Sequence, residues 1–302
     1  MGDIQTKMSE LCEAPEKLLP KRILGIKHSG QLGDIVYSLP AARQLMEKAY
    51  CTHLIYFIPS DTAIDPKSKV NHFGGALMVT QSMFEFIRPL LLHIDYVYDV
   101  IFLPRERIPG GVVDLDIFRN YGSNTAAGSI PGYFFKSLEM PRYDHGPWIT
   151  LKQKASHKDS GILLARSTRY LNNSIDYTLL GQFAVNTRFM GTEREYHMFH
   201  NRYPGLNATH LQVSDALDAA RAINSCSLFI GNQSVFFSIA EGLQAIRLLE
   251  SFEPVPNVVS HGGIHGSFLS TNGLLRMSAE LLGKELSKTQ THTSAPEYLL
   301  SI

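Results

Sequence analysis

The architecture can be inferred from one stretch near the N-terminus, residues 22–45, RILGIKHSGQLGDIVYSLPAARQL. It opens with a short apolar run that contains β-branched residues, the pattern of a buried strand. A loop with Gly30 and Gly33 follows, and apolar residues then recur at helical spacing after Asp34. The order strand, glycine loop, helix predicts the ligand-binding corner of a doubly wound α/β domain, where free N–H groups at the helix N-terminus attract phosphates or sugar hydroxyls.

The glycines of this corner match no nucleotide fingerprint. Gly25, Gly30 and Gly33 lack the G-x-G-x-x-G spacing of dinucleotide-binding folds, and no Gly-Lys-Ser/Thr of a P-loop is present. Asp34 has two interpretations on spacing alone. It is either an N-cap that accepts backbone N–H bonds, or a carboxylate base at the mouth of a cleft.

Length and charge narrow the class of protein. The 302 residues suffice for two ordinary domains, and 44% hydrophobic and 19% charged residues are typical of a globular chain. Lysine plus arginine and aspartate plus glutamate each number 28, so the formal net charge is zero. No bulk positive field draws the chain to nucleic acid, and we expect no stable nucleic-acid partner.

Cysteine usage and the N-terminus indicate a compartment. Cys12, Cys51 and Cys226 are widely spaced and form neither a metal motif nor a disulfide framework. Residues 1–17 are polar and charged, unlike a signal peptide, and no stretch approaches the ~20 apolar residues of a membrane span. We expect a cytoplasmic protein, with peripheral association at the inner membrane face left open.

A polar segment without apolar periodicity, residues 151–160, separates two halves that both alternate strands and helices. We therefore predict two Rossmann-like domains, residues 1–155 and 156–302, with the last helix able to pack back on the N-terminal domain. Among the expected elements are a strand at 111–118, a helix at 174–185, a strand at 257–260 and a helix at 273–286.

Two arginines and two hydroxyls follow the first strand of the second half, in ARSTRYLNNS, residues 165–174. The guanidinium groups of Arg166 and Arg169, with Ser167 between them, suit the oxygens of a diphosphate. The alternative is a pair of surface arginines on a loop.

A second strand–loop–helix corner lies in FIGNQSVFFSIAEGL, residues 229–243. Its loop is Gly231-Asn232-Gln233-Ser234, and Ser234 stands where a helix N-terminus would meet a phosphate. An ordinary capping serine beside a tight glycine turn explains the same pattern.

Three further patterns have both a functional and a structural interpretation. Asp114 and Asp116 either face an acceptor or lie at a strand end near solvent. The aromatic residues 133–135 either form a platform for a sugar or pack in the core. The histidine pairs of H-x-x-H and H-x-x-x-H spacing have no third ligand at the spacing of a known metal motif, so we expect no metal site. These pairs are His197 with His200 and His261 with His265.

Residues 23–45 resemble the N-terminal motif of the ADP-heptose:lipopolysaccharide heptosyltransferases, glycosyltransferases of the GT-B architecture. The matching positions are Lys27, Ser29, Gly33, Asp34, Ile35–Tyr37, Leu39 and Pro40. In that family the aspartate of Gly-Asp is the general base toward the acceptor hydroxyl, which implies this role for Asp34. The resemblance also implies that Ser29, Gly30, Gln31 and Gly33 lie near acceptor and donor.

The second corner also resembles this family, whose strand–Gly–x–Asp–(Ser/Thr)–Gly–helix element holds the sugar and diphosphate of the donor. Here Asn232 replaces the acid, and the spacing to the helix differs by about one residue. The family's lysine for the donor phosphates is absent, so Arg166 or Arg169 would replace it. The resemblance implies a donor site that also includes Gln233 and Ser234, with a glutamate, Glu250 or Glu241, on the ribose; salt bridging at the surface is the alternative for both glutamates. His261 lies in a glycine-rich loop from which it would reach the cleft.

The resemblance implies a GT-B glycosyltransferase that moves a sugar from a nucleotide-diphosphate sugar to an acceptor hydroxyl, inverting and metal-independent, with no cofactor. Asn232 motivates an alternative, a non-catalytic nucleotide- or glycan-binding protein that kept the fold. A weaker alternative is an NAD-linked oxidoreductase, with Asp61 at the end of the second strand as its ribose-binding acid, but the glycine pattern argues against it.

Overall fold

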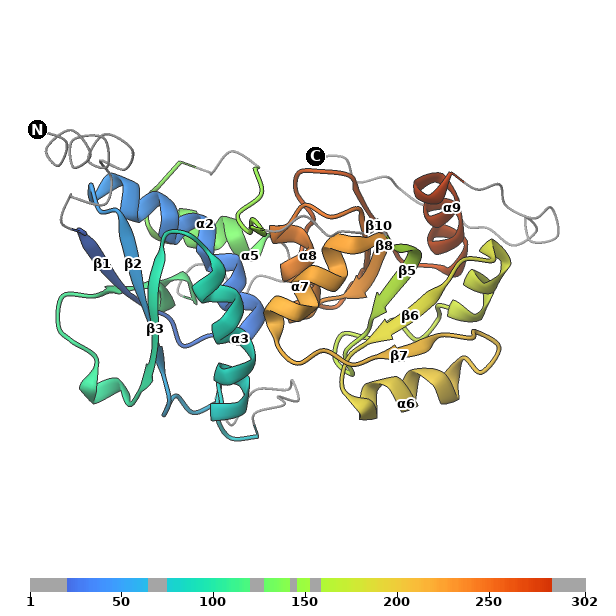
Figure 1. Ribbon diagram of the computed structural model, residues 1–302, viewed down its shortest axis with the longest axis horizontal. Helices are drawn as coiled ribbons and strands as arrows, with labels where there is room; N and C mark the ends of the chain where they lie inside the picture. The colour runs from blue at the N-terminus through green and yellow to red at the C-terminus, as the bar shows by residue number, and fades with distance from the viewer. Residues whose placement is uncertain (1–20, 65–74, 120–127, 142–145, 153–158, 284–302) are drawn as a thin grey trace, which may run out of the picture.

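The computed structural model describes residues 21–64, 75–119, 128–141, 146–152 and 159–283. Two parallel sheets stand side by side, one from each half of the chain (Figure 1). The N-terminal sheet has four strands in the order β3 (Val97–Leu103), β2 (His53–Pro59), β1 (Ile23–Lys27), β4 (Val113–Asp114). The C-terminal sheet has six, in the order β10 (His265–Phe268), β9 (Arg247–Glu250), β8 (Cys226–Asn232), β5 (Asp159–Ala165), β6 (Thr187–Met190), β7 (Thr209–Leu211).

Both sheets have the strand order of a doubly wound fold. In each, the chain first builds outward from the first strand and then returns to its other side, which is the Rossmann arrangement. This confirms the predicted α/β class with two Rossmann-like domains. The segment between the two sheets includes residues 153–158, which lie outside the described part of the chain.

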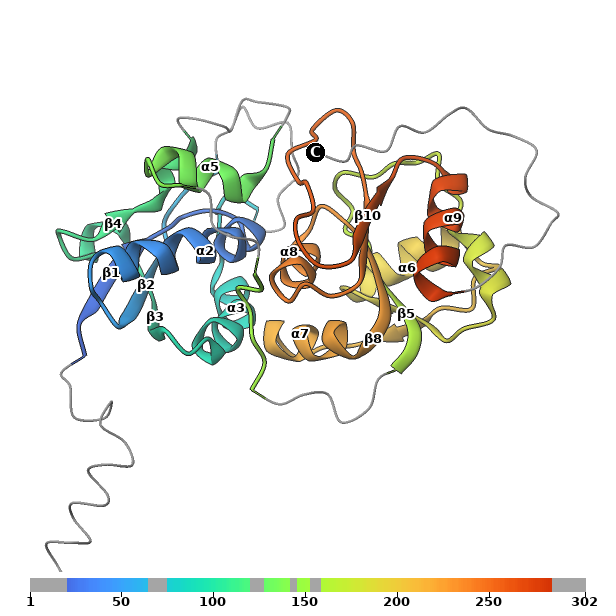
Figure 2. The same ribbon diagram turned by 90° about the horizontal axis from the view of Figure 1, so that it is seen from above.

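Helices cover the sheets and meet between the domains. The N-terminal domain contributes α2 (Leu32–Lys48), α3 (Gln81–His93) and α5 (Ile130–Ser137). The C-terminal domain contributes α6 (Glu193–Arg202), α7 (Ala216–Ser225), α8 (Val235–Gly242) and α9 (Thr271–Leu282). α2 packs against α8 and α3 against α7, so helices of both domains form the interface (Figures 1 and 2). None of the described helices is long and apolar enough to cross a membrane.

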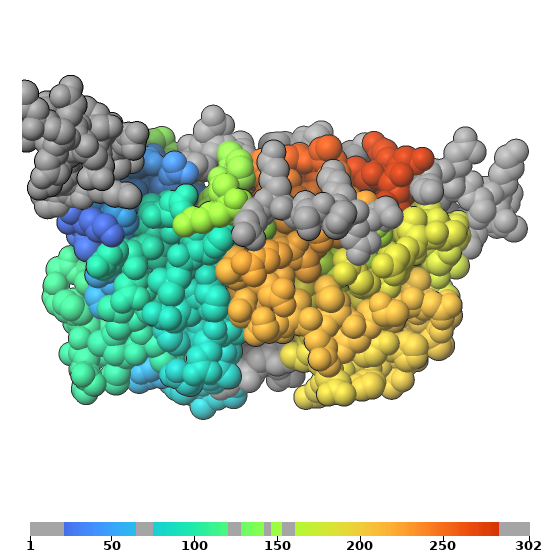
Figure 3. Space-filling view, viewed as in Figure 1, coloured from blue at the N-terminus to red at the C-terminus, as the bar shows by residue number. Residues whose placement is uncertain are grey.

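One continuous apolar core joins the two domains. It includes the inner faces of α2 and α3, the helices α7 and α8, and alternate residues of the C-terminal strands such as Leu163 and Phe229. The opposite face of the C-terminal sheet belongs to a second cluster that contains Ile162, Leu164 and Leu228. This alternation is expected of parallel strands buried on both faces. In the space-filling view the two domains abut along the seam where α3 meets α7 (Figure 3).

Several predicted elements differ in the structure. Residues 111–118 form only the short β4 and then a 3-10 helix, η3 (Leu115–Phe118), because the side chain of Asp114 caps that turn by accepting from the Asp116 N–H. The predicted helix at 174–185 is a 3-10 helix, η4 (Tyr177–Phe183), capped by Asp176 and ended by a left-handed Ala184. Residues 257–260 are not a strand, and β10 takes the edge instead. α9 packs on the C-terminal sheet, so it does not return to the N-terminal domain.

Candidate active site

Most of the predicted site residues lie at the two points where the strand order reverses, while Glu250 ends β9 and His261 follows that strand. In the N-terminal sheet this point is between β1 and β4, and in the C-terminal sheet between β5 and β8. Loops that leave neighbouring strands in opposite directions open a crevice at such a point, and ligands of doubly wound folds bind there. The loops after β1, β5 and β8 are the three corners that the sequence analysis singled out.

The N-termini of α2 and α8 meet between the domains. A methyl group placed on Gly33 would lie 3.9 Å from the backbone carbonyl of Ser234 and 3.9 Å from Oγ of Ser238. The Gly-Asp motif of the first domain and the Asn-Gln-Ser motif of the second are therefore in contact. Two helix N-termini that converge in this way combine their positive potentials, which favours an anionic ligand.

Asp34 is the third residue of α2 and lies at this junction. The N-cap is Gln31, whose side chain makes no capping bond and donates instead to the Met78 carbonyl, at 2.8 Å. The N-cap interpretation of Asp34 is therefore wrong. No described residue donates a hydrogen bond to the Asp34 carboxylate. Burial raises the pKa of Tyr170 in the C-terminal domain; the Arg169 charge opposes that rise and the Asp34 charge adds to it.

Behind the Asp34 loop lies a buried cluster around Asp116. Its carboxylate accepts from Nδ1 of His28 at 3.0 Å, from the Ser29 N–H at 2.9 Å and from the Ser29 hydroxyl at 2.6 Å, and it pairs with Arg119. Burial raises the pKa of Asp116, but the hydrogen bond from His28, the positive charge of Arg119 and the Ser29 bond outweigh it and hold that pKa well below its usual range. The strand-end interpretation of Asp116 near solvent is wrong, and the sequence analysis gave His28 no role.

The ends of β5 and β9 are tied together by a buried ion pair. The Arg166 guanidinium donates to both oxygens of Glu250, at 2.6 and 2.9 Å. Glu250 also accepts from the Tyr177 hydroxyl at 2.7 Å and the Asn172 N–H at 2.6 Å. Both charged groups are buried and bind each other rather than solvent. This ion pair holds the loop from which Arg169 extends. The surface alternative for Glu250 is wrong.

Asn232 and Gln233 also make their contacts inside the protein. The Asn232 amide accepts from the Ser167 N–H at 2.9 Å and donates to the carbonyls of Ser167 and Arg169, at 3.0 and 2.6 Å. Gln233 donates to the Val255 carbonyl at 2.8 Å. These two amides fix the shape of the corner.

Ser234, Arg169 and Tyr170 complete the C-terminal side. Ser234 is the N-cap of α8, with its hydroxyl accepting from the Phe237 N–H at 3.4 Å. The Arg169 guanidinium lies 5.5 Å from the ring centre of Tyr170, and that ring packs against Phe252 at 5.7 Å. Tyr170 has a φ of 52°, a left-handed conformation that is costly for an aromatic residue and recurs at functional sites.

A second buried carboxylate connects the domains. Glu241 on α8 accepts from the Tyr37 hydroxyl on α2 at 2.9 Å and from the His261 N–H at 2.9 Å. Burial raises the pKa of Glu241 to about 7, although Arg247, the Tyr37 bond and the His261 bond act in the opposite direction. Glu241 is thus no surface residue, and His261 takes part in this link through its backbone.

Other candidate residues are accounted for by packing. Phe134 and Phe135 are buried, as core packing requires, and His200 stacks on Tyr196. Within the described ranges, no three histidine, cysteine or acidic side chains gather at a metal-binding distance.

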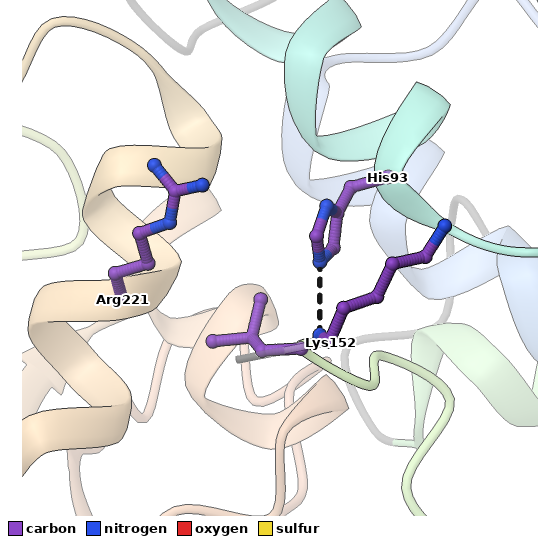
Figure 4. A pocket seen from close by; sticks show the side chains of 4 residues that line it. His93, Lys152 and Arg221 are labelled. Carbon is purple, nitrogen blue, oxygen red and sulfur yellow. Dashed lines mark hydrogen bonds between the residues drawn. The ribbon is translucent and has the colours of Figure 1, made fainter. Parts of the chain in front are cut away.

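A small pocket of about 190 Å³ lies at the domain junction between α3, α7 and the connecting segment. It is lined by His93, Leu151, Lys152 and Arg221, and Nε2 of His93 accepts from the Lys152 N–H at 3.1 Å (Figure 4). None of these residues belongs to the corners described above.

No protein-family model and no curated protein matches the sequence. Among solved structures, E. coli heptosyltransferase WaaC with ADP has a TM-score of 0.56 at 11% identity, over 86% of this chain and 99% of that chain. The same protein with ADP-2-deoxy-2-fluoro heptose has a TM-score of 0.54 at 9% identity, over 85% and 99%. A glycosyl transferase family 9 protein of Veillonella parvula has a TM-score of 0.52 at 14% identity, over 87% and 98%.

The chain has the heptosyltransferase fold. The likeness extends through both domains, which confirms the predicted GT-B architecture and the resemblance first seen at residues 23–45. In this heptosyltransferase-like fold, the described structure brings together Gly33, Asp34 and Ser234, and it turns the charged groups of Arg166 and Glu250 toward each other.

Proposed function

We propose that this protein transfers a sugar from a nucleoside-diphosphate sugar to an acceptor hydroxyl, by metal-independent inverting displacement. The observation that carries the proposal is the contact between the Gly33–Asp34 corner and the Ser234 corner, at the N-termini of α2 and α8. It puts a carboxylate without a described hydrogen-bond donor beside a site suited to a diphosphate.

In the proposed reaction Asp34 removes the proton of the acceptor hydroxyl while that oxygen attacks the anomeric carbon. The diphosphate leaves toward the N-terminus of α8, where the Ser234 hydroxyl and the first N–H groups of the helix stabilise its negative charge. Arg169 adds a positive charge. Arg166, Asn232 and Glu250 hold this corner in shape rather than contact the donor.

The assignment is tested by ligand binding and then by turnover. A thermal-shift panel of ADP, UDP, GDP, CDP, TDP and NAD should give a response to one nucleoside diphosphate, since a ligand at a hundred times its Kd adds ~2.7 kcal/mol. With the matching nucleotide sugar, Asp34→Ala should lower kcat by ~10²–10⁴-fold. Asp61→Ala is the matched control, because Asp61 also follows a strand of this sheet but accepts only from the Arg105 N–H among the described residues.

Full transfer activity in Asp34→Ala would exclude Asp34 as the base. A response to NAD alone would contradict the transferase proposal and favour an oxidoreductase. We further propose that the reaction takes place in the cytoplasm or at the inner face of the membrane, the setting that the sequence composition favours.

A second candidate function is nucleotide or glycan binding without turnover. It is supported by the internal hydrogen bonds that the polar groups of Arg166, Glu250 and Asn232 form. These bonds reduce the number of side chains that can bind a leaving diphosphate. This function predicts a thermal response to a nucleoside diphosphate and no hydrolysis or transfer of any matching sugar, even with a mixture of glycan acceptors.

A further inference from the structure

His28 is a fully buried histidine directly behind the proposed base. Nδ1 of its ring contacts Asp116 at 3.0 Å, and the rings of Phe118 and Phe134 approach its edges at centroid distances of 5.5 and 5.3 Å. Its other nitrogen, Nε2, is buried and has no hydrogen-bond partner among the described residues. A buried polar nitrogen without a partner is costly, so its presence calls for a physical reason.

The unpartnered nitrogen and the side chain of Asp34 both lie close to Gly30. A methyl group placed on Gly30 would lie 2.8 Å from Cε1 of His28 and 2.8 Å from Cβ of Asp34, and closer still to Nε2 of His28. The imidazole edge and the Asp34 side chain therefore lie next to the same point in space. Glycine is required at position 30 because any side chain there would separate them.

The hydrogen-bond pattern sets the tautomer of His28. The Asp116 carboxylate only accepts, and its low pKa keeps it ionised, so Nδ1 of His28 must carry a proton. In the neutral ring, Nε2 is then a free lone pair. Asp116 is thus a carboxylate that fixes the orientation of an imidazole whose other nitrogen lies near the Asp34 side chain, without a hydrogen bond to it.

We propose that His28 is a positioning residue that acts through Asp34 and takes up the proton that Asp34 removes from the acceptor hydroxyl. This inference rests on the proposed function. As the acceptor oxygen bonds to the anomeric carbon and the bond from that carbon to the diphosphate breaks, the hydroxyl proton moves to an Asp34 oxygen. The Asp34 side chain then turns toward Nε2 of His28 and passes the proton to it, which leaves Asp34 ionised and an imidazolium near two carboxylates.

The charges around His28 make this step favourable. Asp116 and Asp34 stabilise the imidazolium, and Arg119, which pairs with the same Asp116 oxygen as His28, acts against it. The flanking phenylalanine rings exclude water and strengthen the interaction between the charges. An aspartate alone is a weak base at neutral pH, so a second proton acceptor behind it moves the transfer toward completion.

The first test is ¹⁵N NMR of the His28 ring in the full chain, with His28→Gln to assign its signals. We expect the neutral ring to carry its proton on Nδ1. Asp34→Asn should shift the Nε2 resonance of His28, because it removes a charged group close to that nitrogen. The matched control, Asp61→Asn, should leave that resonance unchanged. A proton on Nε2 in the neutral ring, or an Nε2 resonance that Asp34→Asn does not move, would overturn the proposal.

The second test uses turnover with the donor found in the nucleotide panel. His28→Gln should lower kcat by about tenfold or more, leave KM near the wild-type value and move the acidic limb of the pH–rate profile to lower pH. His53→Gln, at the solvent-facing start of β2, is the control. A variant His28→Gln with wild-type kcat and pH profile overturns the proton role, even where NMR shows the coupling.

The two proposals fail in different ways. If no nucleotide gives a thermal response and no sugar is turned over, the transferase function is contradicted. The proton role of His28 is then contradicted as well, whatever the NMR shows. Turnover that depends on Asp34 but not on His28 contradicts only the present inference.

Discussion

At the end of β8, Asn232 stands where the resembled family has an acid. Its carbonyl accepts from one backbone N–H and its NH₂ group donates to two backbone carbonyls, all in the loop after β5. Only an amide can both accept and donate in this way. The departure from the family pattern therefore has a local cause, because the loop of residues 166–169 closes over this side chain.

Asn232→Asp should destabilise the protein by about 3 kcal/mol, because a buried carboxylate would face the carbonyl oxygens of Ser167 and Arg169. Urea unfolding at pH 7 measures this loss. Asn173→Asp is the control, since exposed Asn173 accepts from Arg202 at 2.8 Å and an aspartate keeps that bond. Equal stabilities of the two variants would contradict the assigned role of the Asn232 amide.

At the scale of elements, α2 and α8 are connected by the buried carboxylate of Glu241. Its pKa is raised to about 7 in the folded protein, chiefly by burial, against an ordinary value of 4.5. The folded state therefore holds a proton that the unfolded state releases between these two values. The contribution of this group to stability is fully present below about pH 4.5 and is lost as the pH rises to about 7.

Glu241→Gln should remove this dependence, because an amide cannot ionise. We expect wild-type protein to lose roughly 2–3 kcal/mol relative to Glu241→Gln between pH 4.5 and 7, and nothing further above pH 7.5. Thermal unfolding of both proteins across this pH range gives the difference between their free energies of unfolding. The contributions of the other titrating groups are the same in both proteins and cancel in this difference. A constant difference between pH 4.5 and 8 would mean that Glu241 is ionised throughout.

The elements also show what the sequence could predict. Strong apolar periodicity predicted the bounds of β1, α2, β8 and α8 closely. These elements are buried, so their sequences show the spacing of apolar residues that burial requires. α6 was missed although its capping box, Thr192 with Glu195, is visible in the sequence. The apolar run at 111–118 was misassigned because a side-chain cap from Asp114, rather than strand pairing, satisfies its backbone.

The site was predictable only in part, for a related reason. Asp34, Gly33 and Ser234 follow strands in glycine-containing corners, and that order alone indicates a ligand site. The partners of Arg166, Glu250, Glu241 and His28 come from distant parts of the chain, so no local pattern could tell a buried pair from a ligand contact. The position of Asp116 beside His28 depends on β4 pairing with β1.

At the scale of the whole molecule, the apolar core continues from one domain into the other. Helices α2 and α3 pack on α8 and α7, and Phe86 meets Phe236 across this interface at a centroid distance of 6.1 Å. Trp148, the only tryptophan, is buried at the same junction, and its backbone N–H donates to the Gly242 carbonyl of α8 at 3.0 Å. Domains that share a core lose it together when they separate.

We therefore expect the two domains to unfold as one unit, although chains of this length often unfold domain by domain. In urea, the fluorescence of Trp148 and the far-ultraviolet circular dichroism should change at the same midpoint. Phe236→Ala should lower both midpoints together, by about 1–2 kcal/mol in free energy, because it removes part of the shared interface. Met198→Ala, on the exposed side of α6, should change neither. A Trp148 transition that precedes the circular dichroism change would mean that the domains part before they unfold, and that the contact between Gly33 and Ser234 can open while both domains stay folded.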